Sequence, residues 1–225
     1  MQQTPAHDFF NGDLLSFMPP DCNRVVEVGC STGALARAYL KVNSNCHYAG
    51  VEIDPNYAEA ARKICAEAVV GDVETMPGET FERLFACDCA VFGDTLEHLR
   101  DPWDVLRRIR PLLRPGGRVV ACIPNAQHWS VQLRLACGLF RYEDAGLLDR
   151  THLRWFTRIT ALEMFQSCGY RVIDGKPRIF PEAERERFLP AIRAMATAAG
   201  FDPDQAVADA SPLQYVLVAV PETQV

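Results

Sequence analysis

Residues 25–40 read VVEVGCSTGALARAYL, and this stretch decides the fold. It begins as a continuous apolar run typical of a buried strand, passes through a short turn and continues at once as a helical pattern. Gly29 and Gly33 lie in the turn, where the lack of a side chain lets a ligand approach the main chain closely. Their spacing is not the G-x-G-x-x-G of dinucleotide-binding turns, whose middle glycine makes room for a pyrophosphate. Ser31 takes that middle position here, so the turn favours a ligand whose amino-acid moiety lies across it.

The same alternation of strand and helix continues along the first half of the chain. Apolar runs bounded by turn signals predict strands at residues 24–29, 47–53, 68–72, 87–94 and 118–125, with helical patterns at 33–42, 55–65 and 103–113. Strands that are apolar on both faces and separated by helices predict a parallel sheet covered on both sides. Ligands bind such sheets beyond the carboxyl ends of the strands, near the switch point of the strand order.

After Asn125 this alternation stops. Helical patterns at 128–140, 158–170 and 182–200 surround a loop at 141–157 that is rich in polar and aromatic residues, and two last strands are predicted at 170–177 and 213–220. The chain has no internal repeat and no low-complexity tract. We therefore expect a single domain over residues 1–225.

The composition is that of an ordinary globular domain. Of the 225 residues, 48% are hydrophobic and 23% are charged, which suffices for one core. No apolar run reaches the roughly 18 residues of a membrane span, and the first ten residues lack the features of a secretory signal. The formal net charge of −6 argues against a nucleic-acid partner, because it would repel phosphates. Neither a membrane nor a nucleic acid is expected as a partner.

The cysteines indicate a reducing compartment. There are nine, and no two are spaced as C-x-x-C. Several fall inside predicted strands, so we expect them to be small apolar core residues of a cytoplasmic protein. Neither the cysteines nor the five histidines cluster at metal-ligand spacing, and the sequence therefore predicts no metal site.

Acidic residues mark the ends of the later strands. Glu52 ends the second strand, where a carboxylate can bind both hydroxyls of a ribose, a contribution of roughly 1.5–3 kcal/mol. Asp72 follows the third strand and can accept a hydrogen bond from an adenine amino group, with Val73 against the base. Asp94 ends the fourth strand, where a ligand amine or the reacting group would lie. Glu52 indicates a nucleoside without choosing between cofactors, since NAD-binding folds carry the same acid.

Five segments resemble, in order and spacing, the motifs of class I S-adenosylmethionine-dependent methyltransferases. They are VVEVGCSTG, GVEIDP, GDVET, the run from CDCAVFGD to RPGG, and VVACIPN, which together cover about residues 22–125. The first turn of that family is usually acidic-x-G-x-G-x-G, and Ser31 departs from it. The resemblance implies a Rossmann-like α/β fold with a seven-stranded, mostly parallel sheet, an antiparallel last strand and helices on both faces. It also implies S-adenosyl-L-methionine as cofactor, S-adenosyl-L-homocysteine as product, and the cofactor-binding residues Glu27, Gly29, Cys30, Ser31, Gly33, Glu52, Ile53, Asp72, Val73, Asp94 and Thr95.

The later segment is similar to a narrower group, small bacterial methyltransferases found with glycosyltransferase, surface-glycan or natural-product genes. The matching segments are IPNAQHWS, GLLDRTHLRWFT and LQYVLVAV. GVEID and PNAQHW are similar, more loosely, to methyltransferase-like proteins linked to methionine biosynthesis. On this basis we divide the domain into an N-terminal helical cap (1–20), a cofactor-binding core (22–125), an acceptor-side lid (126–160) and C-terminal helices with a strand hairpin (161–225).

Transfer to a weakly acidic hydroxyl requires a base, and histidine is the first candidate. His128 and His152 fall in segments over the strand ends, and we rank His152 first, with Asp149 orienting its imidazole. The rival interpretation is that Asp149 and Thr151 cap a helix start. We expect His98 to cap or pack. The acceptor pocket is predicted to include Trp129, Tyr142, Arg150 and Arg154.

The sequence thus predicts methyl transfer to a small-molecule or glycan acceptor, most simply at a hydroxyl. One alternative is a catalytically idle methyltransferase-like partner that regulates another enzyme. A second is an NAD-linked oxidoreductase, which keeps Glu52 but lacks G-x-G-x-x-G. The identity of the acceptor and the oligomeric state are not encoded in any pattern that we recognise.

Overall fold

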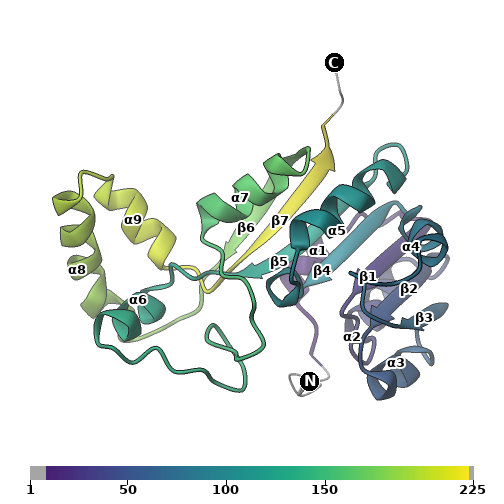
Figure 1. Cartoon of the computed structure of the whole chain (residues 1–225), viewed down its shortest axis with the longest axis horizontal. Coiled ribbons are helices and arrows are strands. Elements are labelled where there is room, and N and C mark those ends of the chain that lie inside the picture. The colour runs from purple at the N-terminus through teal and green to yellow at the C-terminus, as the bar shows by residue number, and fades with distance from the viewer. Residues whose placement is uncertain (1–8, 223–225) are drawn as a thin grey trace.

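The structure is a computed structural model that describes residues 9–222. Its centre is a seven-stranded sheet in the order β3-β2-β1-β4-β5-β7-β6, visible in Figure 1. Strands β1 to β5 run parallel, while β7 is antiparallel to both of its neighbours. The strands are β1 Arg24–Val28, β2 His47–Glu52, β3 Glu67–Val70, β4 Cys89–Gly93, β5 Arg118–Pro124, β6 Tyr170–Arg178 and β7 Gln214–Pro221. The predicted fold class is confirmed.

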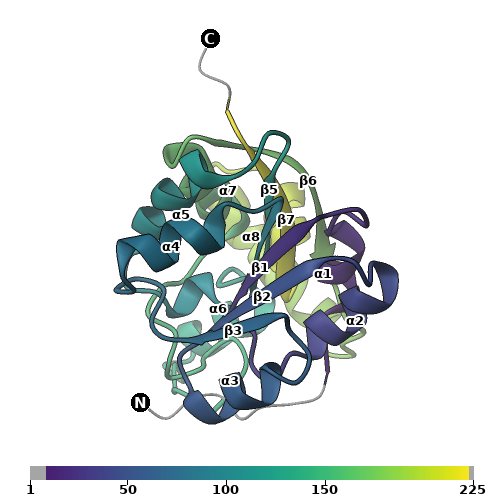
Figure 2. The ribbon, with the colours of Figure 1, turned by 90° about the vertical axis from the view of Figure 1, so that its right-hand side faces the viewer.

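Helices cover both faces of the sheet, as Figure 2 shows. One face carries α1 Gly12–Phe17, α2 Ala34–Val42 and α3 Pro55–Ala61, and the other carries α4 Gly78–Phe85, α5 Pro102–Ile109 and α7 Arg158–Ser167. Neighbouring strand residues alternate between the two cores: Val25 packs in one and Val26 in the other, both fully buried. Alternation of this kind explains why the strands read as continuous apolar runs.

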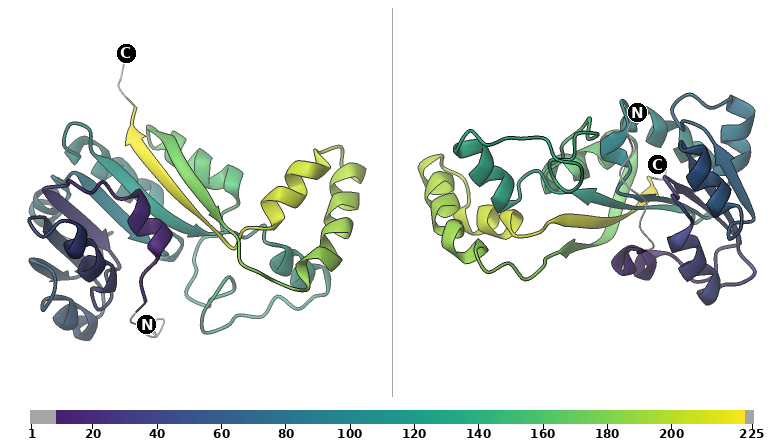
Figure 3. Two further views of the ribbon diagram at one scale, coloured as in Figure 1. Left: turned by 180° about the vertical axis from the view of Figure 1, so that it is seen from behind. Right: turned by 90° about the horizontal axis from the view of Figure 1, so that it is seen from below.

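Three further helices form a helical lobe set apart from the sheet, seen from behind and below in Figure 3. They are α6 Trp129–Ala136, α8 Arg185–Ala198 and α9 Pro203–Ala210. Their shared core is centred on Trp129, Ile192 and Ala210. This grouping differs from the predicted division at residue 160, because α6 packs with helices of the C-terminal part while α7 packs on α5 of the sheet.

Two helices were not predicted, α4 and α9. Each has only eight residues, which is short for a periodic pattern to stand out. Two short 3₁₀ helices, η1 Leu96–His98 and η2 Arg110–Leu112, flank α5. Of the predicted N-terminal cap (1–20), α1 is present, while residues 1–8 lie outside the described part of the chain.

The cysteines match the expectation drawn from the sequence. Every cysteine is a free thiol, and all except Cys137 are buried, as predicted for small apolar core residues. Among the described residues, no helix combines the length and apolar character that crossing a membrane requires.

Candidate active site

Three residues with left-handed backbone conformations shape the loop between β1 and α2. Gly29, Ser31 and Gly33 have φ angles of 73°, 46° and 83°, a region that glycine enters freely and other residues enter at a cost. A Cβ atom at Gly29 would lie 2.7 Å from Thr95 Oγ1, so this position excludes a side chain. The result is a tight loop with few side chains at the carboxyl end of β1.

Cys30 supports this loop from the protein interior. Its side chain is 2% exposed, and a Cβ atom at Gly50 of β2 would lie only 2.4 Å from its sulfur. The main-chain N–H of Gly29 donates to the Val51 carbonyl at 2.8 Å. The Cys30 side chain therefore packs on β2 beneath the loop, and only its main chain can face a ligand.

Glu52, the last residue of β2, joins the ends of two strands. It is buried, its Oε2 accepts from the Ser31 N–H at 2.8 Å, and its Oε1 accepts from the Asp54 N–H at 3.0 Å. An ionised carboxylate offers about four acceptor positions, so both oxygens can also take a hydroxyl donor. The side chain of Ile53 beside it is 48% exposed and gives the carboxylate an apolar neighbour.

Glu27 lies on β1 just before the loop. It is buried, and the Tyr48 hydroxyl donates to its Oε2 at 2.8 Å. Burial raises the pKa of Glu27 to about 8; the hydrogen bond from Tyr48 opposes that shift and the charge of Glu52 reinforces it. At neutral pH Glu27 is therefore mostly the uncharged acid.

Asp72 follows β3 in a short turn. Its Oδ1 accepts from the Glu74 N–H at 2.8 Å, and its Oδ2 lies 3.4 Å from Arg100 Nη2. Val73 is 3% exposed and packs in the core. The prediction that Val73 lies against a base is therefore wrong for its side chain, which is taken up by apolar packing.

Asp94 and Thr95 tie the end of β4 to its neighbours. Asp94 accepts a hydrogen bond from Gln214 of β7, and Thr95 Oγ1 donates to the Val28 carbonyl at 2.9 Å. Asp94 has a φ of 53°, and with Ser31 it makes up the non-glycine residues of positive φ among residues 9–222. Backbone strain of this kind collects at functional sites, and both residues lie where the strand order switches between β1 and β4.

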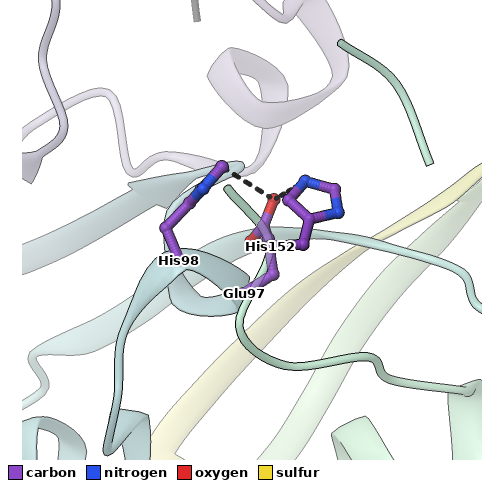
Figure 4. Close-up of side chains that lie close together, drawn as sticks. All are labelled: Glu97, His98 and His152. Atoms are coloured by element: carbon purple, nitrogen blue, oxygen red, sulfur yellow. Dashed lines mark ion pairs between the residues drawn. The ribbon is translucent and has the colours of Figure 1, made fainter. Parts of the chain in front are cut away.

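Two histidines meet at a buried carboxyl group just beyond Asp94. Glu97 and His98 belong to η1, and His152 lies in the loop after α6. Both imidazole Nε2 atoms lie 3.9 Å from Glu97 Oε1, and Figure 4 shows the two rings approaching that oxygen. Burial raises the pKa of Glu97 well above its usual range and lowers the pKa of His152 to about 4. The His152 imidazole is therefore neutral at pH 7.

The residues before His152 form a turn. Asp149 Oδ1 accepts from the N–H and the hydroxyl of Thr151, at 2.8 and 2.7 Å. No helix begins here within the described part of the chain, so the interpretation of Asp149 and Thr151 as helix caps is wrong. The charge of Asp149 raises the pKa of His152 against the larger effect of burial, and its predicted orienting role stays a prediction.

His128 and Trp129 belong to the helical lobe. His128 Nε2 lies 3.2 Å from Glu182 Oε2, and its Nδ1 lies 2.8 Å from Ser130 Oγ. Trp129 Nε1 donates to the same Glu182 at 2.7 Å, and its ring stacks on Phe188. The prediction that Trp129 lines an acceptor pocket is wrong, because this side chain forms the core of the lobe. Both nitrogens of His128 are engaged there too.

Tyr142 lies in an exposed aromatic patch. Its ring centroid is 6.0 Å from that of Phe140 and 6.4 Å from that of Trp155. The exposed fractions of these three residues are 58%, 36% and 39%. Aromatic surface of this extent is therefore present in the loop that was predicted to cover the strand ends.

Arg150 and Arg154 both have contacts within the chain. Arg150 pairs with Asp144 at 2.7 Å. Arg154 donates to the Arg100 carbonyl, and its guanidinium lies 6.0 Å from the centre of the Trp103 ring. Either arginine would have to exchange these contacts to bind an acceptor.

Two cavities lie away from the loops that follow β1, β2 and β4. One of about 340 Å³ opens between α5 and α7 beside Trp103 and Met164. The other, of about 410 Å³, lies on the helical lobe beside Ile192 and Phe201. Neither is lined by a residue of the loops that follow β1, β2 or β4, so neither coincides with the strained edge of the sheet.

Sequence reasoning missed Glu97 as a site residue. Its signal was the pair Glu97–His98, which begins three residues after the strand-end residue Asp94. What the sequence could not supply was the return of the chain, 53 residues later, that brings the loop at Thr151 back against His98.

Comparison with known proteins identifies the central part of the chain. A family model described as "Methyltransferase domain" matches residues 26–119. An uncharacterized 37.1 kDa protein in transposon TN4556 of Streptomyces fradiae is 32% identical over 102 residues, which cover 43% of this chain and 28% of that protein. A phosphoethanolamine N-methyltransferase of Triticum aestivum is 29% identical over 116 residues, with coverages of 48% and 21%. The chain thus spans less than a third of the length of these two relatives.

A third relative is matched over more of its length. The ubiquinone biosynthesis O-methyltransferase of Aeromonas salmonicida is 26% identical over 160 residues, which cover 67% of this chain and 64% of that protein. Among solved structures, a chain from the complex between the Haloferax volcanii Trm112 methyltransferase activator and the putative methyltransferase superposes with a TM-score of 0.60. It is 18% identical, and the superposition covers 93% of this chain and 88% of that one. The two chains therefore share a fold.

The family match contains the left-handed loop, Glu52, Asp72 and Asp94, the same residues that the structure gathers at one edge of the sheet. The fold has the seven-stranded order with an antiparallel last strand that the resemblance implies. Residues 26–119 of the chain therefore match a methyltransferase domain, and the chain shares the fold of solved methyltransferase structures.

Proposed function

We propose that this chain transfers the methyl group of S-adenosyl-L-methionine to a hydroxyl group of a small-molecule or glycan acceptor. The observation that carries the proposal is the strained edge at the switch point, where Ser31 and Asp94 take left-handed conformations on either side of the β1–β4 junction. The family match to a methyltransferase domain over residues 26–119 supports the same assignment.

In this proposal the amino-acid part of the cofactor lies over the loop from Gly29 to Gly33. Glu52 binds the ribose hydroxyls, and Asp72 with the exposed Ile53 borders the adenine. Asp94 and Thr95 face the methionyl amine or the reacting methyl group. Glu27 and Cys30 support the loop from within, since both side chains are buried.

Methyl transfer mainly requires that the acceptor be aligned with the sulfonium methyl group. A sulfonium methyl is already electrophilic, and holding an acceptor in line at near-contact distance can supply roughly 7–11 kcal/mol of the barrier. In the reaction the carbon–sulfur bond breaks with its electron pair left on sulfur, and a bond forms from the acceptor oxygen to the methyl carbon. The hydroxyl proton passes to solvent water, directly or through a base. The products are the methyl ether and S-adenosyl-L-homocysteine.

The acceptor side of the site lies in the loop that carries Tyr142 and His152. His152 is better placed than His128 to act on an acceptor, because it lies beside Glu97 at the end of β4 while His128 is held by Glu182 in the helical lobe. Arg150 and Arg154 border the same loop and could bind an anionic group of the acceptor. An O-methyltransferase among the relatives supports oxygen as the methylated atom. The proposed acceptor class rests on the sequence resemblance of IPNAQHWS and GLLDRTHLRWFT alone.

Calorimetry with S-adenosyl-L-homocysteine tests the cofactor assignment. Glu52→Gln removes one charged acceptor while keeping the shape, and hydrogen bonds to a charged group contribute roughly 1.5–3 kcal/mol. We therefore expect the affinity to fall about 10- to 100-fold. Glu59→Gln, an exposed carboxylate on α3 paired with Arg62, is the matched control and should bind like the wild type. Equal affinity in wild type and Glu52→Gln would contradict the proposal.

A second candidate function is a methyltransferase-like chain that regulates a partner. The looser similarity of GVEID and PNAQHW to methyltransferase-like proteins linked to methionine biosynthesis is the observation in its favour. Such a chain would form no S-adenosyl-L-homocysteine from the cofactor with any hydroxyl acceptor and would co-purify with a second protein. Formation of S-adenosyl-L-homocysteine with even one acceptor would rule out this regulatory function.

A further inference from the structure

Glu97, His98 and His152 form a cluster that main-chain hydrogen bonds hold together. The N–H groups of Leu153 and Arg154 both donate to the Glu97 carbonyl, at 2.8 and 3.0 Å. These two bonds fasten the loop that carries His152 onto η1, whatever the side chains do. The three side chains therefore meet because the backbone brings them together.

Among the described residues, the carboxyl group of Glu97 lies near two imidazoles but has no hydrogen-bond partner. The residue is 1% exposed, and within the described part of the chain neither of its side-chain oxygens has a hydrogen-bond partner. Burying an unpaired carboxyl group is costly, and proteins normally pair such a group or use it to bind a metal ion. Both carboxyl oxygens of Glu97 are therefore available to a ligand.

The tautomer of His98 is set by its surroundings. His98 Nδ1 lies 3.2 Å from the Thr151 carbonyl oxygen, so the N–H is at Nδ1 and the lone pair is at Nε2. The Thr151 hydroxyl is in turn held by Asp149 at 2.7 Å. A carbonyl or carboxylate behind an imidazole is the usual arrangement around a metal-bound histidine, where it orients the ring.

The distances suit a small ion after a slight contraction. One ligand atom from each of the three residues lies within 4.8 Å of the others, and both Nε2 atoms lie 3.9 Å from Glu97 Oε1. Ligands of a tetrahedral ion with bonds near 2.05 Å lie about 3.4 Å apart. Each side chain needs to shift by about 1 Å or less. The side chain of His98 is 29% exposed, which leaves an approach from solvent.

We propose that Glu97, His98 and His152 bind one divalent transition-metal ion, with one or two coordination positions left open toward the end of β4. Two imidazoles and one carboxylate are a ligand set for Zn²⁺, Fe²⁺, Mn²⁺ or Co²⁺. This set disfavours Mg²⁺ and Ca²⁺, because both ions prefer oxygen ligands. The sequence prediction of no metal site is thereby replaced, since the two histidines are distant along the chain and adjacent in the fold.

Resting on the proposed function, the ion would bind the acceptor hydroxyl in an open position. A hydroxyl bound to a divalent cation is more acidic, and it releases its proton to solvent water. The oxygen then attacks the methyl carbon as the carbon–sulfur bond breaks, with the electron pair staying on sulfur. His152 would serve in this reaction as a ligand, the role that suits a neutral imidazole.

Metal uptake tests the site without any acceptor. The metal-free full-length chain, carrying Cys137→Ser to remove its exposed thiol, is dialysed against Co²⁺ and analysed by metal content and visible absorption. We expect roughly one ion per chain, with the intense bands of a four- or five-coordinate site. Glu97→Gln and His152→Ala should each reduce uptake at least tenfold. His47→Ala, which removes a histidine that pairs with Glu67 on another part of the sheet, should leave it unchanged.

Folding is checked by the melting temperature of each variant. Bound Co²⁺ should raise the melting temperature of the parent, since a ligand of the native state stabilises it, and should leave that of Glu97→Gln unmoved. No uptake by a folded parent chain, equal uptake by Glu97→Gln, or preference for Mg²⁺ would overturn the proposal. Normal S-adenosyl-L-homocysteine affinity in Glu97→Gln would separate this outcome from a failure of the proposed function.

Discussion

At the scale of single residues, the most informative feature is the conformation of Ser31. Ser31 has a φ of 46° and lies in the chain between Gly29 and Gly33, which also have left-handed conformations. The glycine usual at this position in similar enzymes is thus a backbone requirement. The serine meets it at an energetic cost of roughly 1–2 kcal/mol for a left-handed residue other than glycine.

Ser31→Gly should therefore stabilise the chain. Relief of the left-handed strain is offset in part by the greater freedom of glycine in the unfolded state, roughly 0.5–1 kcal/mol. We expect the free energy of unfolding to rise by about 0.5 kcal/mol, measured by urea denaturation. Ser31→Val, whose β-branched side chain tolerates this φ poorly, should lower it by more than about 1 kcal/mol. A clear loss of stability in Ser31→Gly would show that the serine side chain contributes a contact that outweighs the strain.

At the scale of elements, one ion pair fastens the helical lobe to the sheet. Arg158, the first residue of α7, donates from Nε and Nη2 to the two oxygens of Asp209 on α9, at 2.7 and 3.1 Å. Asn125, just after β5, donates to the carbonyl of the same Asp209 at 2.8 Å. A paired geometry of this kind, with Asp209 buried, is far stronger than a surface ion pair.

Asp209→Ala should therefore lower the free energy of unfolding by about 2 kcal/mol, because hydrogen bonds to charged groups contribute roughly 1.5–3 kcal/mol. Asp204→Ala is the matched control on the same helix: its side chain is 82% exposed and pairs with Arg193, so it should cost less than about 0.5 kcal/mol. Chemical denaturation measures both. Equal costs for the two variants would mean that the lobe is held by apolar packing alone.

The elements also show where sequence reasoning succeeds. All seven strands are predicted within about three residues of their observed ends. Strands β1, β2, β4, β5 and β7 are largely buried and read as apolar runs, whereas most of β6 is exposed. Strand-end residues such as Glu52 and Asp94 follow from the same reading. Helix α4 was not predicted because its buried residues, Phe81, Leu84 and Phe85, form only a short apolar stripe on one face of the helix. Trp129 was misplaced because an aromatic residue near a strand end has the same pattern whether it packs inward or lines a pocket.

At the scale of the whole molecule, residues far apart in sequence decide the site. The sheet brings β1, β2 and β4 together, and their loops could be predicted from local patterns. The loop at 141–157 could not be placed, because its position depends on main-chain bonds to Glu97. The cluster of Glu97, His98 and His152 is therefore a property of the complete fold.

The pH dependence of global stability follows from the buried acid on β1. Glu27 faces Tyr48 and Glu52 on β2, and the Cys30 and Cys65 thiols also lie near it. Its pKa is about 8 in the folded chain, against an ordinary value of 4.5 for glutamate. A raised carboxyl pKa means that the folded state holds its proton more tightly. The contribution of protonated Glu27 to the free energy of unfolding is present in full below the pKa of this residue in the unfolded chain. It is lost as the pH rises toward 8, the pKa in the folded chain.

Glu27→Gln should remove this dependence, since the amide keeps the shape and an acceptor for Tyr48 without titrating. The free energy of unfolding of the variant minus that of the wild type should grow between pH 5 and 8 by up to about 1.4 kcal/mol per pH unit. The difference should level off above pH 8, where the folded wild type also loses the proton. Urea denaturation at unit pH intervals measures it. A difference that stays constant over this range would mean that Glu27 is ionised in the folded chain, and that the acid beneath the loop adds a negative charge near the proposed cofactor site.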